Sequence, residues 1–514
     1  MGSLPILIHL RVPPMRKHLF AIVVLSLGLA NGASAAEPIA PRPANADQWR
    51  AAALRDIQAG YEVTLANHAG TRDPHNPAFP GNLERARTQA QALAASVKDA
   101  VGYHAALLRF TALIGDGHAG VYPSFDVDEF RPTRWPGFVV AWRGDLFVLS
   151  AEDNAARAGE RIVSCDGTPA QRLMEDKVFG YFGRPKEEGQ WWGQARQLFY
   201  DNGNPFAPRP TRCVFEADGK QVERTLDWRD APKDLYQRGR EGVIGKPLPL
   251  GLSEPRKGLF WVAMPTFDPG ENERAAYRAL YKQIGDGRQR FLDADAVVVD
   301  LRGNNGGSSW WSRDFAAALW GEGRLTRRAA AATAKQETWY RAAPDNIAYF
   351  RQLAEERSAQ GEAQTAQWSK AIADNMDQAR AAGQDYFVNK STSAPLAADP
   401  QADLPGDPAP FTRPLYVIVP GNCASACLDA IDYFKLFPNT KLVGAPSSAD
   451  STYMEVRLVA LPGGLGRVVV PTKLYVNRPR GNGVFYRADI PVTALQWTFE
   501  AFRDAIEADL ARKP

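Results

Sequence analysis

Ser425 is the residue whose surroundings favour chemistry most clearly. It lies in the stretch PGNCASACLDAIDYF, from Pro420 to Phe434, which directly follows the apolar run Leu415–Val419. This order predicts a strand, a tight turn and a helix that begins near Ser425. Free backbone N–H groups and the positive end of the helix dipole favour an oxyanion at such a position. The segment therefore predicts an acyl-transfer nucleophile, although a serine that only caps its helix has the same pattern.

A second turn contains the backbone groups that a nucleophile of this kind needs. The apolar run Ala296–Leu301 ends in Arg302-Gly303-Asn304-Asn305-Gly306-Gly307, and the helical stretch SSWWSRDFAAALW follows. Neighbouring glycines let backbone N–H groups face a ligand without obstruction by side chains. An ordinary glycine-rich turn between strand and helix is the alternative. Taken together, the two turns predict a serine nucleophile and donors for its tetrahedral oxyanion.

A general base is also required, because serine is a weak nucleophile unless a neighbouring group accepts its proton. Only six histidines are present, and two of them precede residue 37. His118 ends the run FTALIGDGH, where an apolar helical stretch breaks at two glycines and presents the ring on a turn. His104 shares a helix with apolar residues and is interpreted as a packing residue, whereas His68 and His75 flank a polar loop and are interpreted as surface residues. His118 is therefore the predicted base.

Three segments, in this order, resemble the C-terminal-processing (tail-specific) serine peptidases, which are related to the tricorn protease core: LIGDGHAG, VVVDLRGNNGG and NCASACLDA, followed by LVGAPSSAD. The resemblance covers about residues 110–492 and implies an α/β catalytic core of the crotonase/ClpP type. Position by position, Ser425 matches the family nucleophile and His118 the base of its triad-type members. The Gly306-Gly307 pair matches the glycines beside the oxyanion hole, and Ala426 supplies the N–H after the nucleophile.

The chain departs from this family pattern in two places. Many members use a Ser–Lys dyad, but the corresponding segment Val443–Val456 contains no lysine. Triad-type members have a late acidic residue, but Arg478–Val484 contains none. We therefore expect His118 to act with another carboxylate. Glu455 is the first candidate, followed by Asp450 and then Asp489, and each of them can equally be a solvated carboxylate.

The composition and the first residues indicate the structural class and the cellular location of the protein. Its 514 residues predict about three domains, with apolar and charged fractions typical of globular proteins. Residues 1–36 are a predicted Sec-type signal peptide with a basic start, an apolar run and the small-residue site Ala33-Ser34-Ala35. Met15 is an alternative start to Met1. The apolar run is too short for a membrane span, so we expect a periplasmic or secreted protein without stable membrane insertion.

The composition also limits the partners. Removal of residues 1–36 takes away three basic residues and no acidic one, which leaves 58 of each sign. A near-neutral chain does not suggest a nucleic-acid partner. No zinc-type cluster, phosphate loop or dinucleotide fingerprint is present, so no metal and no cofactor is expected. The expected partners are protein or peptide substrates, and the sequence leaves the oligomeric state open.

Beyond the leader, the chain divides into three predicted parts. Residues 37–130 form a helical domain, because apolar positions recur at helical spacing. Residues 131–235 contain short strands and an Asp-Gly turn that resemble a PDZ-like module, although a β-rich spacer without a binding role has the same pattern. Residues 245–514 form the catalytic α/β domain, whose first strand is expected at 258–264. A mostly helical insertion at 326–410 is expected over the site, either as a lid or as solvent-exposed decoration.

Four cysteines in an exported protein predict two disulfides. Cys165 and Cys213 both fall in the β-rich part, while Cys423 and Cys427 bracket Ser425, so local pairing gives Cys165–Cys213 and Cys423–Cys427. Two cysteines four residues apart on a regular helix lie too far apart for a disulfide. Cys423, however, is expected on the loop before the helix and is free of that constraint.

The function predicted from these observations is a periplasmic serine endopeptidase that hydrolyses peptide bonds of exported proteins or peptides. Ser425 is its expected nucleophile, His118 its base and Glu455 the orienting acid. The main alternative is a catalytically inactive relative that keeps the fold and binds peptides or an apolar ligand in its cleft. An acyl-CoA enzyme of the crotonase type is disfavoured, because coenzyme A is absent outside the cytoplasm.

Overall fold

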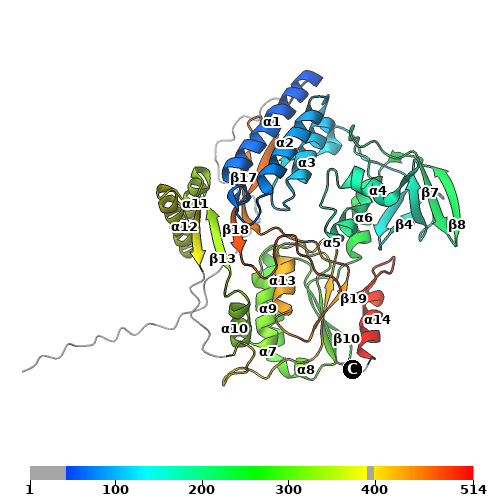
Figure 1. The fold of residues 1–514 in the computed structure, drawn as a ribbon. Helices are drawn as coiled ribbons and strands as arrows, with labels where there is room; N and C mark the ends of the chain where they lie inside the picture. The colour runs from blue at the N-terminus through cyan, green and yellow to red at the C-terminus, as the bar shows by residue number, and fades with distance from the viewer. Residues whose placement is uncertain (1–41, 391–398, 513–514) are drawn as a thin grey trace, which may run out of the picture.

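The structure is a computed structural model that describes residues 42–390 and 399–512. The predicted signal peptide, residues 1–36, lies outside the described residues. The described chain is a mixed α/β protein with several sheets (Figure 1). None of its described helices is both long and apolar enough to cross a membrane.

The sheet that carries Ser425 has six strands in the order β10-β11-β12-β15-β16-β19. All neighbours from β11 onward are parallel, whereas β10 pairs antiparallel with β11. The expected first strand of the domain is β11, but β10 precedes it at the edge. The strands are β10 (Gly251–Arg256), β11 (Leu259–Ala263), β12 (Ala296–Asp300), β15 (Leu415–Val419), β16 (Thr440–Gly444) and β19 (Ile490–Pro491).

Helices cover both faces of this sheet, which explains why its central strands read as continuous apolar runs. In β15, Leu415, Val417 and Val419 contribute to one core, and Tyr416 and Ile418 contribute to another. The first core also contains residues of α7 (Glu271–Asp286), α8 (Arg288–Leu292), α9 (Trp310–Trp320), α10 (Glu322–Ala332) and α13 (Ala426–Phe434). The second core contains residues of α14 (Phe499–Leu510). The strand–turn–helix units predicted around residues 302–307 and 420–425 are therefore present.

The N-terminal helices pack on a second sheet rather than forming an isolated bundle. These helices are α1 (Ala46–Asn67), α2 (Phe79–Ala94) and α3 (Ala100–Ile114). The sheet has the order β1-β18-β13-β14, with β17 also paired to β18. Its strands are β1 (Gly120–Pro123), β13 (Glu337–Arg341), β14 (Tyr386–Lys390), β17 (Tyr453–Ala460) and β18 (Gly466–Val476). One apolar cluster joins the helices to β1, β14 and β18, so segments far apart in the chain share a core (Figure 1).

The insertion at 326–410 is only partly helical. Its helices are α11 (Pro344–Ala359) and α12 (Ala363–Ala381), which pack on each other. The strands β13 and β14 flank this pair and join the second sheet through β18. The segments ETWYR and YFVNK contain aromatic and β-branched residues, which favour strands, and this signal explains the difference from the helical expectation. A lid role for the insertion stays a prediction.

The part between residues 131 and 235 is built on an antiparallel sheet of order β3-β4-β5-β7-β8, with β6 (Thr168–Pro169) also paired to β5. Its main strands are β3 (Phe138–Trp142), β4 (Leu146–Ala151), β5 (Arg161–Cys165), β7 (Arg212–Ala217) and β8 (Lys220–Thr225). Two short strands, β2 (Arg134–Trp135) and β9 (Arg229–Asp230), pair beside it. The helices of this part are α4 (Ala170–Leu173), α5 (Glu188–Gln194) and α6 (Leu235–Ile244). A disulfide joins Cys165 to Cys213 across β5 and β7, as predicted.

Candidate active site

Ser425 lies on the turn between β15 and α13, directly before the first residue of the helix. Its backbone has φ 56° and ψ −129°, and its hydroxyl makes no capping bond. Positive φ is unusual for a residue with a side chain and is concentrated at functional turns. A serine that merely capped the helix would have extended backbone and would bond an N–H of the first turn. The backbone of Ser425 is thus that of a strained turn rather than of a helix cap.

The glycine-rich turn lies against Ser425. A Cβ added to Gly306 would come within 2.8 Å of the Ser425 Cβ and 3.2 Å of the Ala426 nitrogen. Gly306 and Gly307 have φ values of 107° and 128°, which strongly favour glycine. The buried Asn304 shapes this turn, because its Oδ1 accepts the Gly306 N–H at 2.9 Å and its Nδ2 donates to the Met264 carbonyl at 3.0 Å. Any side chain at Gly306 would displace Ser425.

The hydrogen bonds of this region distinguish engaged N–H groups from available ones. The Ser425 N–H donates to Asp450, and the Gly306 N–H donates to Asn304. Within the described ranges, no hydrogen bond is found from the N–H of Gly307 or of Ala426. Ala426 directly follows Ser425, and Gly307 follows Gly306, which lies against Ser425. An oxyanion hole needs N–H donors that are otherwise unengaged, as these two are.

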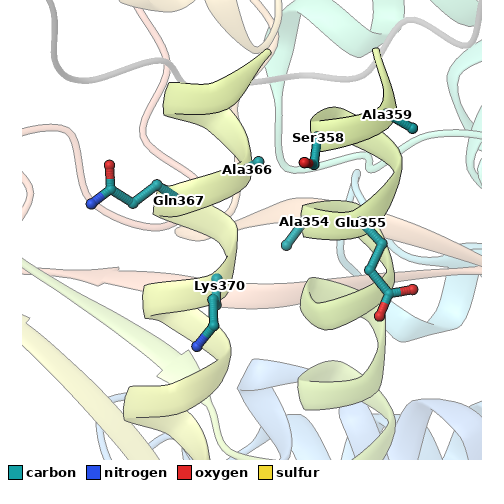
Figure 2. A pocket seen from close by; sticks show the side chains of 7 residues that line it. All are labelled: Ala354, Glu355, Ser358, Ala359, Ala366, Gln367 and Lys370. Atoms are coloured by element: carbon teal, nitrogen blue, oxygen red, sulfur yellow. The ribbon is translucent and has the colours of Figure 1, made fainter. Parts of the chain in front are cut away.

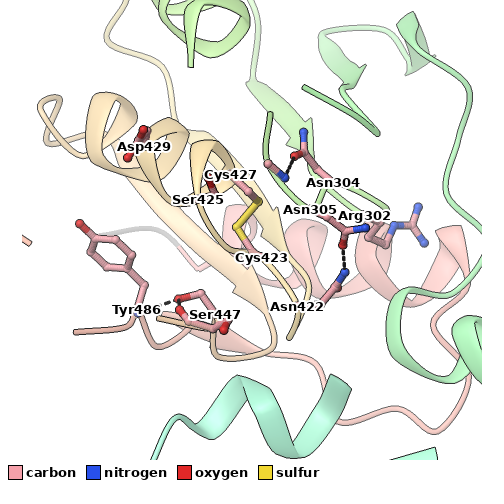
Figure 3. Close-up of a disulfide and its surroundings, with 12 residues drawn as sticks. Arg302, Asn304, Asn305, Asn422, Cys423, Ser425, Cys427, Asp429, Ser447 and Tyr486 are labelled. Carbon is pink, nitrogen blue, oxygen red and sulfur yellow. Dashed lines mark hydrogen bonds between the residues drawn. A yellow bond between two sulfur atoms is a disulfide. The ribbon is translucent and has the colours of Figure 1, made fainter. Parts of the chain in front are cut away.

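A disulfide between Cys423 and Cys427 brackets the nucleophile (Figure 3), as predicted. Cys423 lies on the loop before α13, and the two Cα atoms are 5.3 Å apart. A side-chain bond from Asn422 to Asn305 ties the nucleophile loop to the glycine-rich turn (Figure 3). The two turns are therefore fastened to each other on the side of the disulfide.

His118 follows α3 on a turn that opens with Gly115, whose φ is 77°. The ring is half-buried, and its Nδ1 is buried without a hydrogen-bond partner. No hydrogen bond joins its ring to the Ser425 hydroxyl in the described part of the chain. Contacts between a nucleophile and its base are often long in a free enzyme and shorten when substrate binds.

Asp116 fixes the His118 turn from inside the protein. Its Oδ1 accepts the His118 N–H at 2.9 Å and the Ser451 hydroxyl at 2.6 Å, and its Oδ2 contacts His68 Nε2 at 2.9 Å. Burial opposes ionisation of Asp116, but His68, His118 and the Ser451 hydroxyl outweigh it and lower its pKa. The interpretation of His68 as a surface residue is wrong: the ring is fully buried. His75 is 55% exposed, as expected.

The three acidic candidates are engaged with partners other than His118. Glu455 is buried and pairs with Lys473 Nζ at 3.1 Å. Asp489 accepts the Leu442 N–H at 2.7 Å and so holds β16. Asp450 accepts the Ser425 N–H through both oxygens, at 2.9 and 3.1 Å. None of the three makes a hydrogen bond or ion pair with His118 among the described residues.

Lys473 does not fit the role of a catalytic base. Burial opposes its protonation, but Tyr475, Tyr340 and Glu455 outweigh burial and raise its pKa well above the usual value. A lysine base needs the opposite shift, because only a lowered pKa leaves a neutral amine at neutral pH. The Ser–Lys dyad is therefore disfavoured on electrostatic as well as sequence grounds.

A surface groove between α11 and α12 is separate from these residues (Figure 2). It is lined by Ala354, Glu355, Ser358, Ala359, Ala366, Gln367 and Lys370. No histidine or cysteine lies among them, and none comes from the turns of Ser425 or His118. The groove belongs to the insertion and is not the candidate active site.

Comparison with known proteins assigns a class to this geometry. Residues 260–484 match the model of peptidase family S41. The class of protein is a serine peptidase. A search of curated proteins finds no match.

The fold is similar to that of two solved structures of mature CPAF. Mature CPAF complexed with lactacystin has a TM-score of 0.56 at 15% identity, over 90% of this chain and 97% of the other. Mature CPAF alone has a TM-score of 0.54 at 14% identity, over 90% and 96% of the two chains. The photosystem II D1 C-terminal processing protease has a TM-score of 0.33 at 13% identity, over 85% and 92%.

Sequence reasoning missed several residues that shape the site. Asp116 stands in the quoted motif GDGH, and its position between two glycines is the signal that could have identified it. Asn304 likewise follows a strand in the glycine-rich turn. Ser451 and Arg480 gave no such signal, because their partners lie far away in the chain.

Proposed function

We propose that the protein is a serine endopeptidase in which Ser425 attacks the scissile carbonyl and His118 accepts its proton. The N–H groups of Gly307 and Ala426 stabilise the tetrahedral oxyanion, and the close approach of Gly306 keeps them beside the nucleophile. The observation that carries the proposal is the positive-φ backbone of Ser425 between two unengaged N–H donors. The leaving amine takes the proton back from His118, and a water molecule repeats the sequence on the acyl-enzyme.

The carboxylate that supports the imidazolium is Asp116 in this proposal. Its charge acts on His118 at short range, and it also holds the backbone of the turn. Glu455 is engaged with Lys473 and so is replaced in this role. The site therefore differs from triads in which the acid bonds directly to the ring.

The substrates we propose are exported proteins or peptides, cleaved in the periplasm or outside the cell. Two disulfides support an oxidising compartment. The β-rich part at 131–235 acts as a PDZ-like module that captures an extended C-terminus. The support is its outer strand β8, which has a strand partner on one side only within the described chain. Titration with a peptide ending in a free carboxylate, against its amidated form, tests this module.

A fluorophosphonate probe tests the mechanism directly, because only an activated serine reacts with it readily. Wild-type protein should be labelled, the adduct should map to Ser425, and Ser425→Ala should lose both label and peptide hydrolysis. Ser312→Ala, which removes a buried hydroxyl outside the two turns, should retain both. Absence of labelling in the wild type would reject the catalytic assignment.

A non-catalytic binding relative is the second candidate function. It is favoured by one observation: no hydrogen bond joins Ser425 and His118 in the described chain. Such a protein would bind peptide without hydrolysing it and would not react with the probe.

A further inference from the structure

The two residues of the proposed catalytic pair come from turns that are distant in the chain. His118 follows α3, packed on the second sheet, and Ser425 follows β15 in the first sheet. A contact that brings the two turns into register must therefore cross between the sheets. The neighbouring residues Asp450 and Ser451 lie on the segment that leads from β16 to β17 and thus from one sheet to the other.

Asp450 holds the nucleophile turn. Both of its carboxylate oxygens accept the Ser425 N–H, and the side chain is 3% exposed. The N–H is thereby fixed while Ser425 keeps its positive φ. Arg480 Nη1 lies 3.2 Å from the same carboxylate and neutralises its charge. This neutralisation matters because an uncompensated negative charge beside the nucleophile would oppose formation of an oxyanion.

Ser451 holds the turn of the base. Its hydroxyl donates to Asp116 Oδ1, the atom that also accepts the His118 N–H. The other oxygen of Asp116 is held by His68, whose Nδ1 accepts the Gly70 N–H at 2.8 Å. That bond fixes the tautomer of His68, so its Nε2 carries the hydrogen and donates to Asp116. Asp116 is thus locked from two sides.

We propose that Asp450 and Ser451 are positioning residues that act as one unit, in which Asp450 sets the Ser425 backbone and Ser451, through Asp116, sets the His118 turn. The inference rests on the proposed function, since it concerns the alignment of that catalytic pair. Consecutive Cα atoms are about 3.8 Å apart, so a shift of one anchor is transmitted to the other. No hydrogen bond joins the Ser425 and His118 side chains in the described chain. The dipeptide therefore aligns the two turns in place of a direct bond.

Two variants test the unit, each with a matched control. Asp450→Asn keeps the shape but removes the charge and one acceptor. Asp432→Asn removes another of the carboxylates that pair with Arg480 and does not bond to Ser425. Ser451→Ala removes the bond to Asp116, and Ser447→Ala removes a buried hydroxyl of the same segment that serves Tyr486. Fluorophosphonate labelling, steady-state kinetics, amide hydrogen exchange and thermal melting are measured on each.

Asp450→Asn and Ser451→Ala should each lower kcat on the order of 10- to 100-fold, as expected for small misplacements of reacting groups. KM should change by less than about twofold, and the labelling rate should fall with kcat. The double variant should lose less than the product of the two single losses, because either change already breaks the alignment. The controls should retain wild-type kinetics.

Hydrogen exchange separates this proposal from the proposed function, because it does not require catalysis. Asp450→Asn should raise exchange in peptides that contain Ser425, and Ser451→Ala should raise it in peptides that contain His118. If the wild-type protein is not labelled, the proposed catalytic function is rejected. The exchange rates of the two variants still show whether Asp450 and Ser451 hold their turns. Labelling and exchange equal to the controls in both variants would overturn the proposal. If Asp450→Asn has a strongly lowered melting temperature, the test rests on Ser451→Ala, which removes only one hydroxyl.

Discussion

Glu455 and Lys473 neutralise each other inside the protein, with side chains only 2% and 4% exposed. Lys473 Nζ also lies 5.3 Å from the centre of the Tyr475 ring and 5.7 Å from that of Tyr340. A buried ammonium group is therefore stabilised by one carboxylate and two aromatic faces. The arrangement gives Glu455 a structural role in place of the catalytic one expected from the sequence.

Glu455→Gln should therefore reduce stability rather than catalysis. Removal of one partner leaves a buried charge uncompensated, which costs about 3–5 kcal/mol of unfolding free energy. Denaturant unfolding and kcat should be measured together. The double variant Glu455→Gln/Lys473→Met should regain part of the stability. A large fall in kcat with unchanged stability would instead return Glu455 to the mechanism.

His118→Ala should lower kcat by about 10²- to 10⁴-fold, the usual contribution of a general base, with little change in melting temperature. The ring's Nδ1 makes no hydrogen bond, so its loss removes no buried contact of that kind. His75→Ala is the control, because that ring is largely exposed. Near-full activity of His118→Ala would require a different proton acceptor.

Local patterns predicted the residues whose surroundings are set by nearby sequence. Ser425, Gly306 and Gly307 follow buried strands, and strand–turn–helix order alone indicates where their backbones meet. The burial of His68 could not be predicted, because its partner Asp116 is 48 positions away. The pairing of Glu455 with Lys473 could not be predicted for the same reason, since the two residues meet only across the hairpin of β17 and β18.

The disulfide Cys423–Cys427 restrains the element that carries the nucleophile. It closes the loop onto the first turn of α13, with Ser425 between the two cysteines. A loop this short contributes little through the entropy of the unfolded chain. Its effect is therefore expected on the aim of the Ser425 hydroxyl more than on global stability.

Cys423→Ser/Cys427→Ser should lower the fluorophosphonate labelling rate and kcat by about tenfold while the melting temperature changes little. Cys165→Ser/Cys213→Ser is the comparison, because that bridge closes a loop with a sequence separation of 48 and should contribute more to stability. Peptide mapping without reductant checks both bridges. Free Cys423 and Cys427 thiols in protein isolated from an oxidising compartment would contradict this assignment.

His104, on helix α3, makes the unfolding free energy depend on pH. Burial lowers the pKa of His104, and the partial compensation from Asp126 and Asp128 does not reverse the shift. The folded protein therefore binds a proton on His104 less readily than the unfolded chain does. The contribution of neutral His104 to stability is complete above the unfolded pKa of about 6.5 and decreases as pH falls below it.

His104→Gln should flatten the dependence of unfolding free energy on pH between about 5 and 7. Chemical denaturation of wild type and variant across this interval measures the difference, since the slope reports the protons taken up on unfolding. His75→Gln, at an exposed site, should leave the slope unchanged. Identical slopes for His104→Gln and wild type would show that His104 does not titrate in this way.

Periodicity and turn signals were sufficient for several elements near the site, including β12, β15 and α13. The expectation of a mostly helical insertion at 326–410 missed β13 and β14, where β13 pairs with β18 and β14 pairs with β13. Strand formation in short segments depends on such partners. The joint sheet of N-terminal and C-terminal strands was missed for the same reason.

At the scale of the whole molecule, the β-rich part at 131–235 contacts the segment that anchors the proposed catalytic pair. Glu187 accepts the Ala449 N–H at 3.0 Å, next to Asp450, and is paired with Arg184. Gly189 lies against the Ser447 backbone so closely that a Cβ would come within 2.4 Å. This contact offers a physical route by which that part can affect the alignment of Ser425.

Glu187→Gln should therefore lower kcat/KM by about tenfold, because the loss of charge releases Arg184 and loosens the 447–450 segment. Hydrogen exchange in peptides covering that segment should rise in parallel. Glu188→Gln is the matched control: its side chain pairs with Arg487 at the surface, where solvent screening leaves an ion pair little effect. Equal kinetics and exchange in the two variants would mean that the β-rich part is docked beside the site without influencing it.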